Sequence, residues 1–132
     1  MTTLQELNKE FYISFEYKAT EYANVSGWQS LIRLKEESAS SKDGGRIPAV
    51  VVGHVGFLYI HFPVNGNTSK VESKVRYPVD QWHRVEISQR LEDTKYMYRL
   101  QINGEIVEDT ENSEPREFCN VTVHVGNKER NW

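Results

Sequence analysis

The sequence predicts an all-β fold in which two antiparallel sheets pack face to face as a β-sandwich. Apolar and polar residues alternate with a period of two over Phe11–Tyr17 and Tyr96–Ile102, as in half-buried strands. Turn-forming Gly, Asn and Ser residues separate these short segments along the whole chain. Such spacing is typical of sandwiches and barrels, and 132 residues fit one domain, which we place at residues 1–132.

The first half of the chain predicts several strands joined by polar turns. The segment "TLQELNKE" at 3–10 is the only one that could form a helical turn. The first strand turns Phe11, Ile13, Phe15 and Tyr17 to one side. A Ser- and Gly-rich exposed loop is predicted over 36–48, and Asn65-Gly66 predicts a tight turn. The other predicted strands cover 31–34, 49–52, 57–62 and 71–75.

The stretch "YPVDQWHRVEISQR" at 77–90 contains the clearest strand of the second half. One side of it carries His83, Val85, Ile87 and Gln89, and the other carries Trp82, Arg84, Glu86 and Ser88. We expect the valine and isoleucine to lie in the core. We also expect Trp82 to close one end of the sandwich, because a large aromatic side chain buries much apolar area.

The remaining segments predict a hairpin and a final strand. Asn103-Gly104 suits a type I′ turn between the strand ending at Ile102 and a short strand over 105–107. A polar loop follows over 108–117. The last strand is expected to turn Val121, Val123 and Val125 inward and Thr122 and His124 outward, with Cys119 as a small buried residue.

Composition narrows the function classes. The net charge of -3 and the pI near 5.8 leave no basic stripe, which argues against a nucleic acid partner. No apolar run approaches the roughly 20 residues of a membrane span. The polar start lacks the apolar segment of a signal peptide, so the chain is either cytosolic or begins after a removed leader.

The cysteine content and the asparagine sequons give different indications of the cellular compartment. The single cysteine, Cys119, excludes an internal disulfide and leaves a free thiol or a partner outside this chain. Three sequons, at Asn24, Asn67 and Asn120, are candidate glycosylation sites. We expect an extracellular or secreted protein.

Several segments together resemble a known family. "QWHRVEIS" at 81–88 followed by "YRLQINGEIV" at 98–107 is similar to paired strands of laminin-G-like and pentraxin-like domains, within the concanavalin A-like lectin/glucanase superfamily. "FYISFEYKA", "GGRIPAV" and "FCNVTVHVGN" extend the resemblance over 11–127. The resemblance implies a jelly roll. It also implies one more strand after Trp132, so this domain is either trimmed at its carboxyl end or naturally short.

The resemblance implies a non-catalytic binding or adhesion module whose ligand is a glycan or an extracellular protein. Two alternatives stay open: a divergent carbohydrate-active enzyme on the same jelly roll, and a structural matrix domain that associates with itself. The paired-carboxylate pattern Glu-x-Asp-x-Glu of related glucanases is absent from the sequence, so we predict that the chain is not an enzyme.

The candidate ligand-binding residues are Asp43, Arg46 and His61. The first two belong to the long polar loop, where Gly44-Gly45 would let the backbone approach a ligand. His61 lies in "LYIHFPVNGN", which resembles the sugar-binding strand of galectins without its Asn-Pro-Arg. Many laminin-G-like domains bind calcium at the rim, which makes the loop acids Asp43 and Asp80 candidate ligands. We predict no other cofactor.

Overall fold

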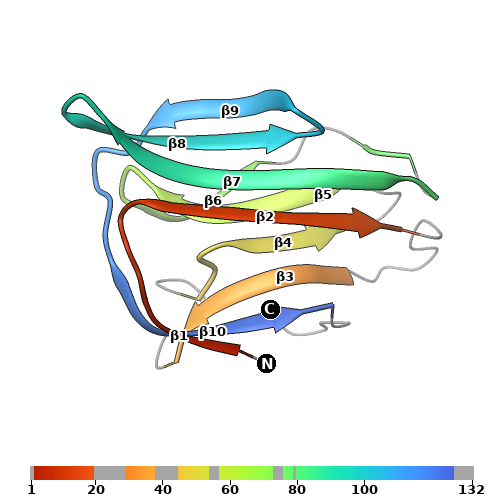
Figure 1. The fold of residues 1–132 in the computed structure, drawn as a ribbon, viewed down its shortest axis with the longest axis horizontal. Coiled ribbons are helices and arrows are strands. Elements are labelled where there is room, and N and C mark those ends of the chain that lie inside the picture. The colour runs from red at the N-terminus through yellow and green to blue at the C-terminus, as the bar shows by residue number, and fades with distance from the viewer. Residues whose placement is uncertain are drawn as a thin grey trace.

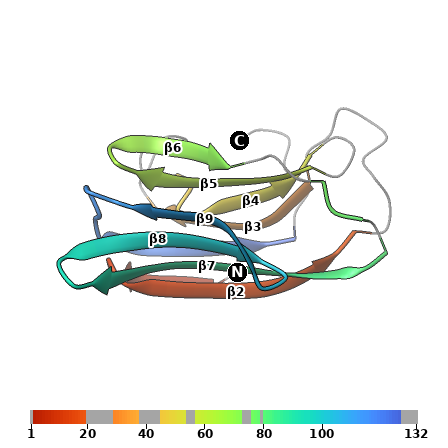
Figure 2. The ribbon, with the colours of Figure 1, turned by 90° about the horizontal axis from the view of Figure 1, so that it is seen from above.

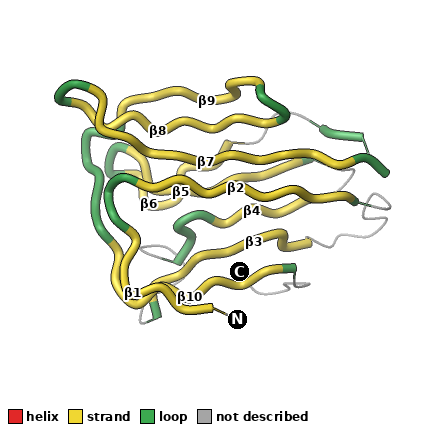
Figure 3. Tube along the Cα trace, viewed as in Figure 1, coloured by secondary structure: helices red, strands yellow, loops and turns green. Residues whose placement is uncertain are grey.

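The computed structural model describes residues 2–19, 29–37, 45–53, 57–72, 76–78 and 80–126. These residues form strands and loops without a helix (Figures 1 and 3), and the strands lie in two layers (Figure 2). The predicted all-β sandwich is therefore confirmed. The strands are β1 Thr2–Leu7, β2 Phe11–Lys18, β3 Gln29–Glu36, β4 Ala49–Val52, β5 Leu58–Val64, β6 Asn67–Glu72, β7 Trp82–Glu92, β8 Lys95–Ile102, β9 Glu105–Glu111 and β10 Phe118–Val125.

Both sheets are antiparallel. The six-stranded sheet has the order β1-β10-β3-β4-β5-β6, and the four-stranded sheet has the order β2-β7-β8-β9. The chain changes sheet between β1 and β2 and again between β2 and β3, so segments distant in sequence pair with one another. In the described residues no helix has the length and hydropathy of a membrane crossing.

The core lies between the sheets and is built from the alternation seen in the sequence. Val85 and Ile87 are fully buried, as predicted. Phe62 of β5 stacks on Tyr98 of β8 with ring centroids 5.1 Å apart, and Phe11 of β2 lies 5.2 Å from Phe62. These aromatic contacts join the two sheets, and stacked rings stabilise beyond the area that they bury.

Two Asn-Gly turns have the backbone conformation that the sequence predicts. Asn65 and Gly66 have φ angles of 55° and 80°, and Asn103 and Gly104 have φ angles of 53° and 84°. Both central residues of a type I′ turn require positive φ, which Asn and Gly tolerate best.

A buried amide network ties the sheets together beneath the first of these turns. Asn112, just after β9, donates from Nδ2 to Gln89 Oε1 at 2.9 Å and to the Pro63 carbonyl at 3.3 Å. Its Oδ1 accepts from the Asn65 backbone N–H at 2.9 Å. Gln89 in turn donates to the Lys9 carbonyl at 2.8 Å. Since buried amides are costly unless bonded, this network fixes how the two layers meet.

The structure corrects the prediction for Trp82, which is 64% exposed. It projects on the outer side of β7, two residues before Arg84, because the strand already extends through Trp82. His83 fills the end of the sandwich instead, between the rings of Tyr17 and Tyr77, each with its centroid 5.4 Å away.

Other local predictions were also wrong. The segment at 3–10 contributes to a strand, because β1 pairs with β10. The predicted loop at 108–117 begins as strand, since β9 continues to Glu111. Cys119 is exposed, because Asn120 has a φ of 51° and the alternation breaks there. At the end of β10, Val125 is 68% exposed.

Candidate functional site

The outer side of the four-stranded sheet carries a dense set of polar and aromatic side chains, which we call the polar face. A row crosses all four strands: Tyr12 of β2 pairs with Ser88 of β7, Ser88 with Arg99 of β8, and Arg99 with Asp109 of β9. Side chains opposite one another in a sheet lie close enough to interact. The other members of the polar face are Ser14, Glu16, Lys18, Trp82, Arg84, Glu86, Arg90, Glu92, Met97 and Gln101.

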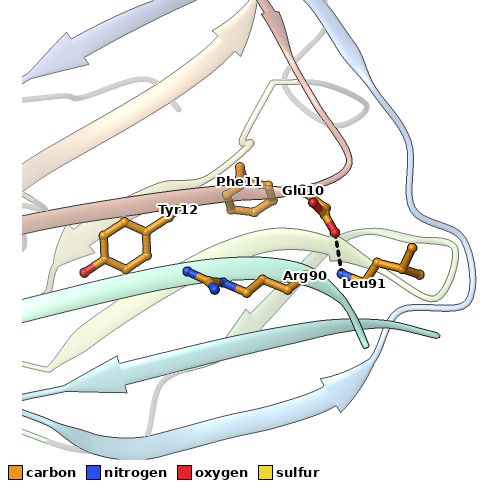
Figure 4. Close-up of a pocket in the computed structure, with 5 residues that line it drawn as sticks. All are labelled: Glu10, Phe11, Tyr12, Arg90 and Leu91. Carbon is orange, nitrogen blue, oxygen red and sulfur yellow. Dashed lines mark hydrogen bonds between the residues drawn. The ribbon is translucent and has the colours of Figure 1, made fainter. Parts of the chain in front are cut away.

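The polar face contains a hollow of about 620 Å³. Ser88 lies in the row between Tyr12 and Arg99. Because its side chain is short and the side chains of Tyr12 and Arg99 are long, the surface is depressed at Ser88. A second hollow of about 360 Å³, whose lining residues are drawn in Figure 4, shares Tyr12, Arg90 and Leu91 with the first, so the two adjoin. The first is lined by Tyr12, Glu86, Ser88, Arg90, Leu91, Glu92, Arg99 and Gln101, and the second by Glu10, Phe11, Tyr12, Arg90 and Leu91.

One edge of the larger hollow is held by a linked set of side chains. The Tyr12 hydroxyl donates to Glu86 Oε2 at 2.7 Å and accepts from Arg84 Nη2 at 3.4 Å. Arg84 also lies 3.4 Å from Glu86 Oε1 and 3.8 Å from Glu16 Oε1. The hydrogen bond to Tyr12, with the nearby charge of Glu86, raises the pKa of Arg84 above its usual value. The position of the Tyr12 ring is thereby fixed before any ligand binds.

Ion pairs also position the side chains at the opposite edge of the larger hollow. Arg99 Nη2 lies 3.3 Å from Asp109 Oδ2 and 3.4 Å from Glu92 Oε2. Two exposed aromatic rings belong to the same face, with Tyr12 50% and Trp82 64% exposed. The arrangement offers flat apolar surface beside oriented donors and acceptors, which suits a ligand with both characters.

The sequence-predicted ligand residues lie on the other sheet or outside the described residues. Asp43 is outside them. His61 of β5 is half-buried on the outer side of the six-stranded sheet, and Arg46 is close enough to affect it. Burial, and secondly the charge of Arg46, lowers the pKa of His61 to about 4. The structure therefore brings Arg46 and His61 together.

Asp80, the second candidate calcium ligand, lies elsewhere. It precedes β7, has a φ of 59°, and donates its backbone N–H to the Ala19 carbonyl after β2 at 2.6 Å. Within the described part of the chain, no three His, Cys, Asp or Glu side chains converge as a metal site would require. Since Asp43 is outside that part, calcium binding stays a prediction.

The three sequons have different positions. Asn24 lies outside the described residues, and Asn67 begins β6 opposite Val64. Asn120 is exposed at the break in β10, and the hydroxyl of its sequon partner Thr122 donates to the Lys35 carbonyl at 3.2 Å.

Sequence reasoning placed none of its ligand candidates on the polar face. Tyr12, Ser88 and Arg99 are each the outward member of a predicted strand, and that alternation was visible. Their meeting depends on the pairing of β2 with β7 and of β7 with β8. The signal available in the sequence was that aromatic and arginine residues occupy outward positions of the strands predicted from alternation.

Comparison with known proteins gives one structural similarity to report. No protein-family model matches the chain, and no curated protein matches it. Among solved structures, the carbohydrate binding module CBM66 from Bacillus subtilis is similar, with a TM-score of 0.49 and 13% sequence identity. The match covers 95% of this chain and 77% of that one. A likeness at this level does not place the chain in a family.

Proposed function

We propose that this protein is a non-catalytic carbohydrate-binding module and that its polar face binds an oligosaccharide. The observation that carries the proposal is the hollow of about 620 Å³ in which the exposed ring of Tyr12 on β2 stands beside oriented polar side chains from β7 and β8.

Sugar rings match this surface in both of their chemical characters. One face of a pyranose presents C–H groups that pack on an aromatic ring, and its rim presents hydroxyl groups. Ser88, Glu86 and Gln101 offer hydroxyl, carboxylate and amide groups around the Tyr12 ring. Because the Tyr12 hydroxyl is already hydrogen-bonded to Glu86, ligand binding costs little side-chain conformational entropy at these two residues.

The same contacts argue against hydrolysis. A glycosidase requires one carboxylic acid that donates a proton and a second carboxylate that acts as base or nucleophile. Glu86 accepts from Tyr12 and pairs with Arg84. Arg99 contacts the carboxylates of Glu92 and Asp109. These acids are engaged in positioning the arginines, which supports binding rather than catalysis.

We place the module in an extracellular protein, as a divergent laminin-G-like domain. The exposed Asn120 and its sequon support this setting. Expression in a secretory mammalian cell should give a band that shifts on treatment with a glycan-removing amidase. The Asn120→Gln variant should lose part of that shift if this sequon carries sugar.

Self-association is a second candidate, favoured by one observation. Ile106 and Val107, on β9 at the edge of the four-stranded sheet, are 57% and 40% exposed. Exposed apolar side chains on an edge strand can pair with a second copy. Sedimentation across a range of concentrations separates the candidates, because a matrix domain would form assemblies without any glycan.

A glycan array followed by calorimetry on the best ligand tests the proposed function. We expect Tyr12→Ala to weaken binding at least about tenfold, since a stacked ring is lost. Val125→Ala, which removes an exposed apolar side chain from the six-stranded sheet, is the matched control. No binding to any glycan by the folded protein, or equal binding by both variants, would refute the assignment.

A further inference from the structure

We propose that the hollow recognises an acidic sugar, a uronic acid unit whose carboxylate binds Arg90. The inference rests on the proposed function, because it names the class of glycan that the polar face takes.

The arginines of the polar face differ in their pairing. Arg84 lies against Glu16 and Glu86, and Arg99 lies against Glu92 and Asp109. The guanidinium of Arg90 makes no ion pair or hydrogen bond among the described residues. The two paired arginines are neutralised within the sheet, so Arg90 is the arginine of the larger hollow whose charge is left to a ligand.

Arg90 is also well placed to meet a bound ring. It lines both hollows, at the point where they adjoin. Figure 4 shows its side chain extending toward Tyr12 and away from Glu10. Glu10 is held on the far side, where its Oε1 accepts from the Leu91 backbone N–H at 3.0 Å. A sugar stacked on Tyr12 would therefore have the guanidinium along one edge.

The chemistry of a guanidinium selects a planar anion for that edge. Its parallel N–H groups match the two oxygens of a carboxylate, and such charge-assisted pairs are stronger than neutral hydrogen bonds. Glu86 and Glu92 line the same hollow and would repel a second anionic group. The lining therefore favours one carboxylate on an otherwise neutral ring over a heavily sulfated chain.

The test compares acidic glycans with forms that lack only the charge. Hyaluronate oligomers and glucuronoxylan oligomers, whose acidic sugars are separated by neutral ones, are titrated by calorimetry, each beside its carboxyl-reduced form. We expect at least one acidic glycan to bind about 10-fold to 100-fold more tightly than its reduced form, as a charged hydrogen-bonded pair contributes. Arg90→Gln should abolish that preference while the variant keeps its β-rich circular dichroism spectrum.

Lys35→Gln is the matched control, because Lys35 is a cation on β3 of the six-stranded sheet, away from the polar face. This variant should keep the preference. Equal binding of acidic and reduced forms, a preference retained by Arg90→Gln, or an equal loss in Lys35→Gln would overturn the inference. In those cases, binding of neutral glycans in a Tyr12-dependent manner would leave the proposed function standing. Absence of any glycan binding would overturn both.

Discussion

At the scale of single residues, His83 shows how one side chain can be fixed by its neighbours. Asn103 Oδ1 accepts from the Arg84 backbone N–H at 2.9 Å, so the Asn103 amide nitrogen faces His83 Nδ1 at 3.0 Å as a donor. Nδ1 must then accept, and Nε2 donates to the Pro78 carbonyl at 2.8 Å. One ring nitrogen therefore donates and the other accepts, and each has a partner.

Val85 and Glu86 are adjacent residues with opposite surroundings, and substitutions should separate them. Val85 is fully buried between the sheets, so Val85→Asp places an unpaired charge in the core and should cost about 4 kcal/mol or more. Glu86→Ala removes a half-exposed ion pair and should cost about 1 kcal/mol or less. Denaturant unfolding measures both changes, and similar midpoints for the two variants would contradict the observed strand register.

His61 should make stability depend on pH. Burial and the nearby Arg46 lower the pKa of His61 to about 4, whereas an unfolded histidine titrates near about 6.5. Between these values the unfolded chain binds a proton that the folded protein does not, so stability falls as the pH falls through this window.

Thermal unfolding at neutral pH and at about pH 4.5 measures this effect. We expect His61→Gln to lose less Tm on acidification than the unmodified protein. His124→Gln controls for the loss of a histidine from the six-stranded sheet. An unchanged pH dependence in His61→Gln would show that other groups are responsible.

At the scale of elements, the turns and connections determine how the sheets meet. The turn at Asn65 and Gly66 is held to the segment after β9 in two ways. Asn65 donates its backbone N–H to Asn112 Oδ1, and its own Oδ1 accepts from the Ser113 backbone N–H at 2.7 Å. The β5–β6 hairpin and the β8–β9 hairpin are therefore joined by side-chain amides as well as by the core.

Asn112→Ala tests the importance of this connection. The substitution leaves the buried Gln89 Oε1 and the part-buried Asn65 backbone N–H without their bonding partner. We expect a loss of about 2–3 kcal/mol in the free energy of unfolding. Gln5→Ala, which removes an exposed amide on β1, should have almost no effect. A cost below about 1 kcal/mol for Asn112→Ala would mean that water replaces the lost amide.

The elements also show what a sequence can predict. Strands such as Phe11–Lys18 were predictable, because alternation with a period of two follows from one buried side. The Asn-Gly turns were predictable, because few residues tolerate positive φ. Strand β1 was not, because "TTLQEL" has no clear alternation and becomes a strand through pairing with β10.

At the scale of the whole molecule, the polar face follows from sheet order. Tyr12, Ser88 and Asp109 are far apart in sequence and lie in one row only because β2, β7, β8 and β9 are neighbours. The alternation predicted that Tyr12 and Ser88 point outward, but Asp109 was predicted to lie in a loop, and alternation could not predict which outward residues meet. Trp82 shows the opposite case, since the alternation already placed it on the same side of β7 as Arg84, and it is exposed there.

The pairing of β1 with β10 has a mechanical consequence. Thr2 pairs with Val123, so the start of one strand lies beside the far end of the other. Tension applied at these two points would load the ladder one pair at a time, as in opening a zipper, whereas tension along offset strands would load all pairs together. β1 would peel away first. Both loaded strands belong to the six-stranded sheet, so this first step of extension would leave the polar face of the other sheet unchanged.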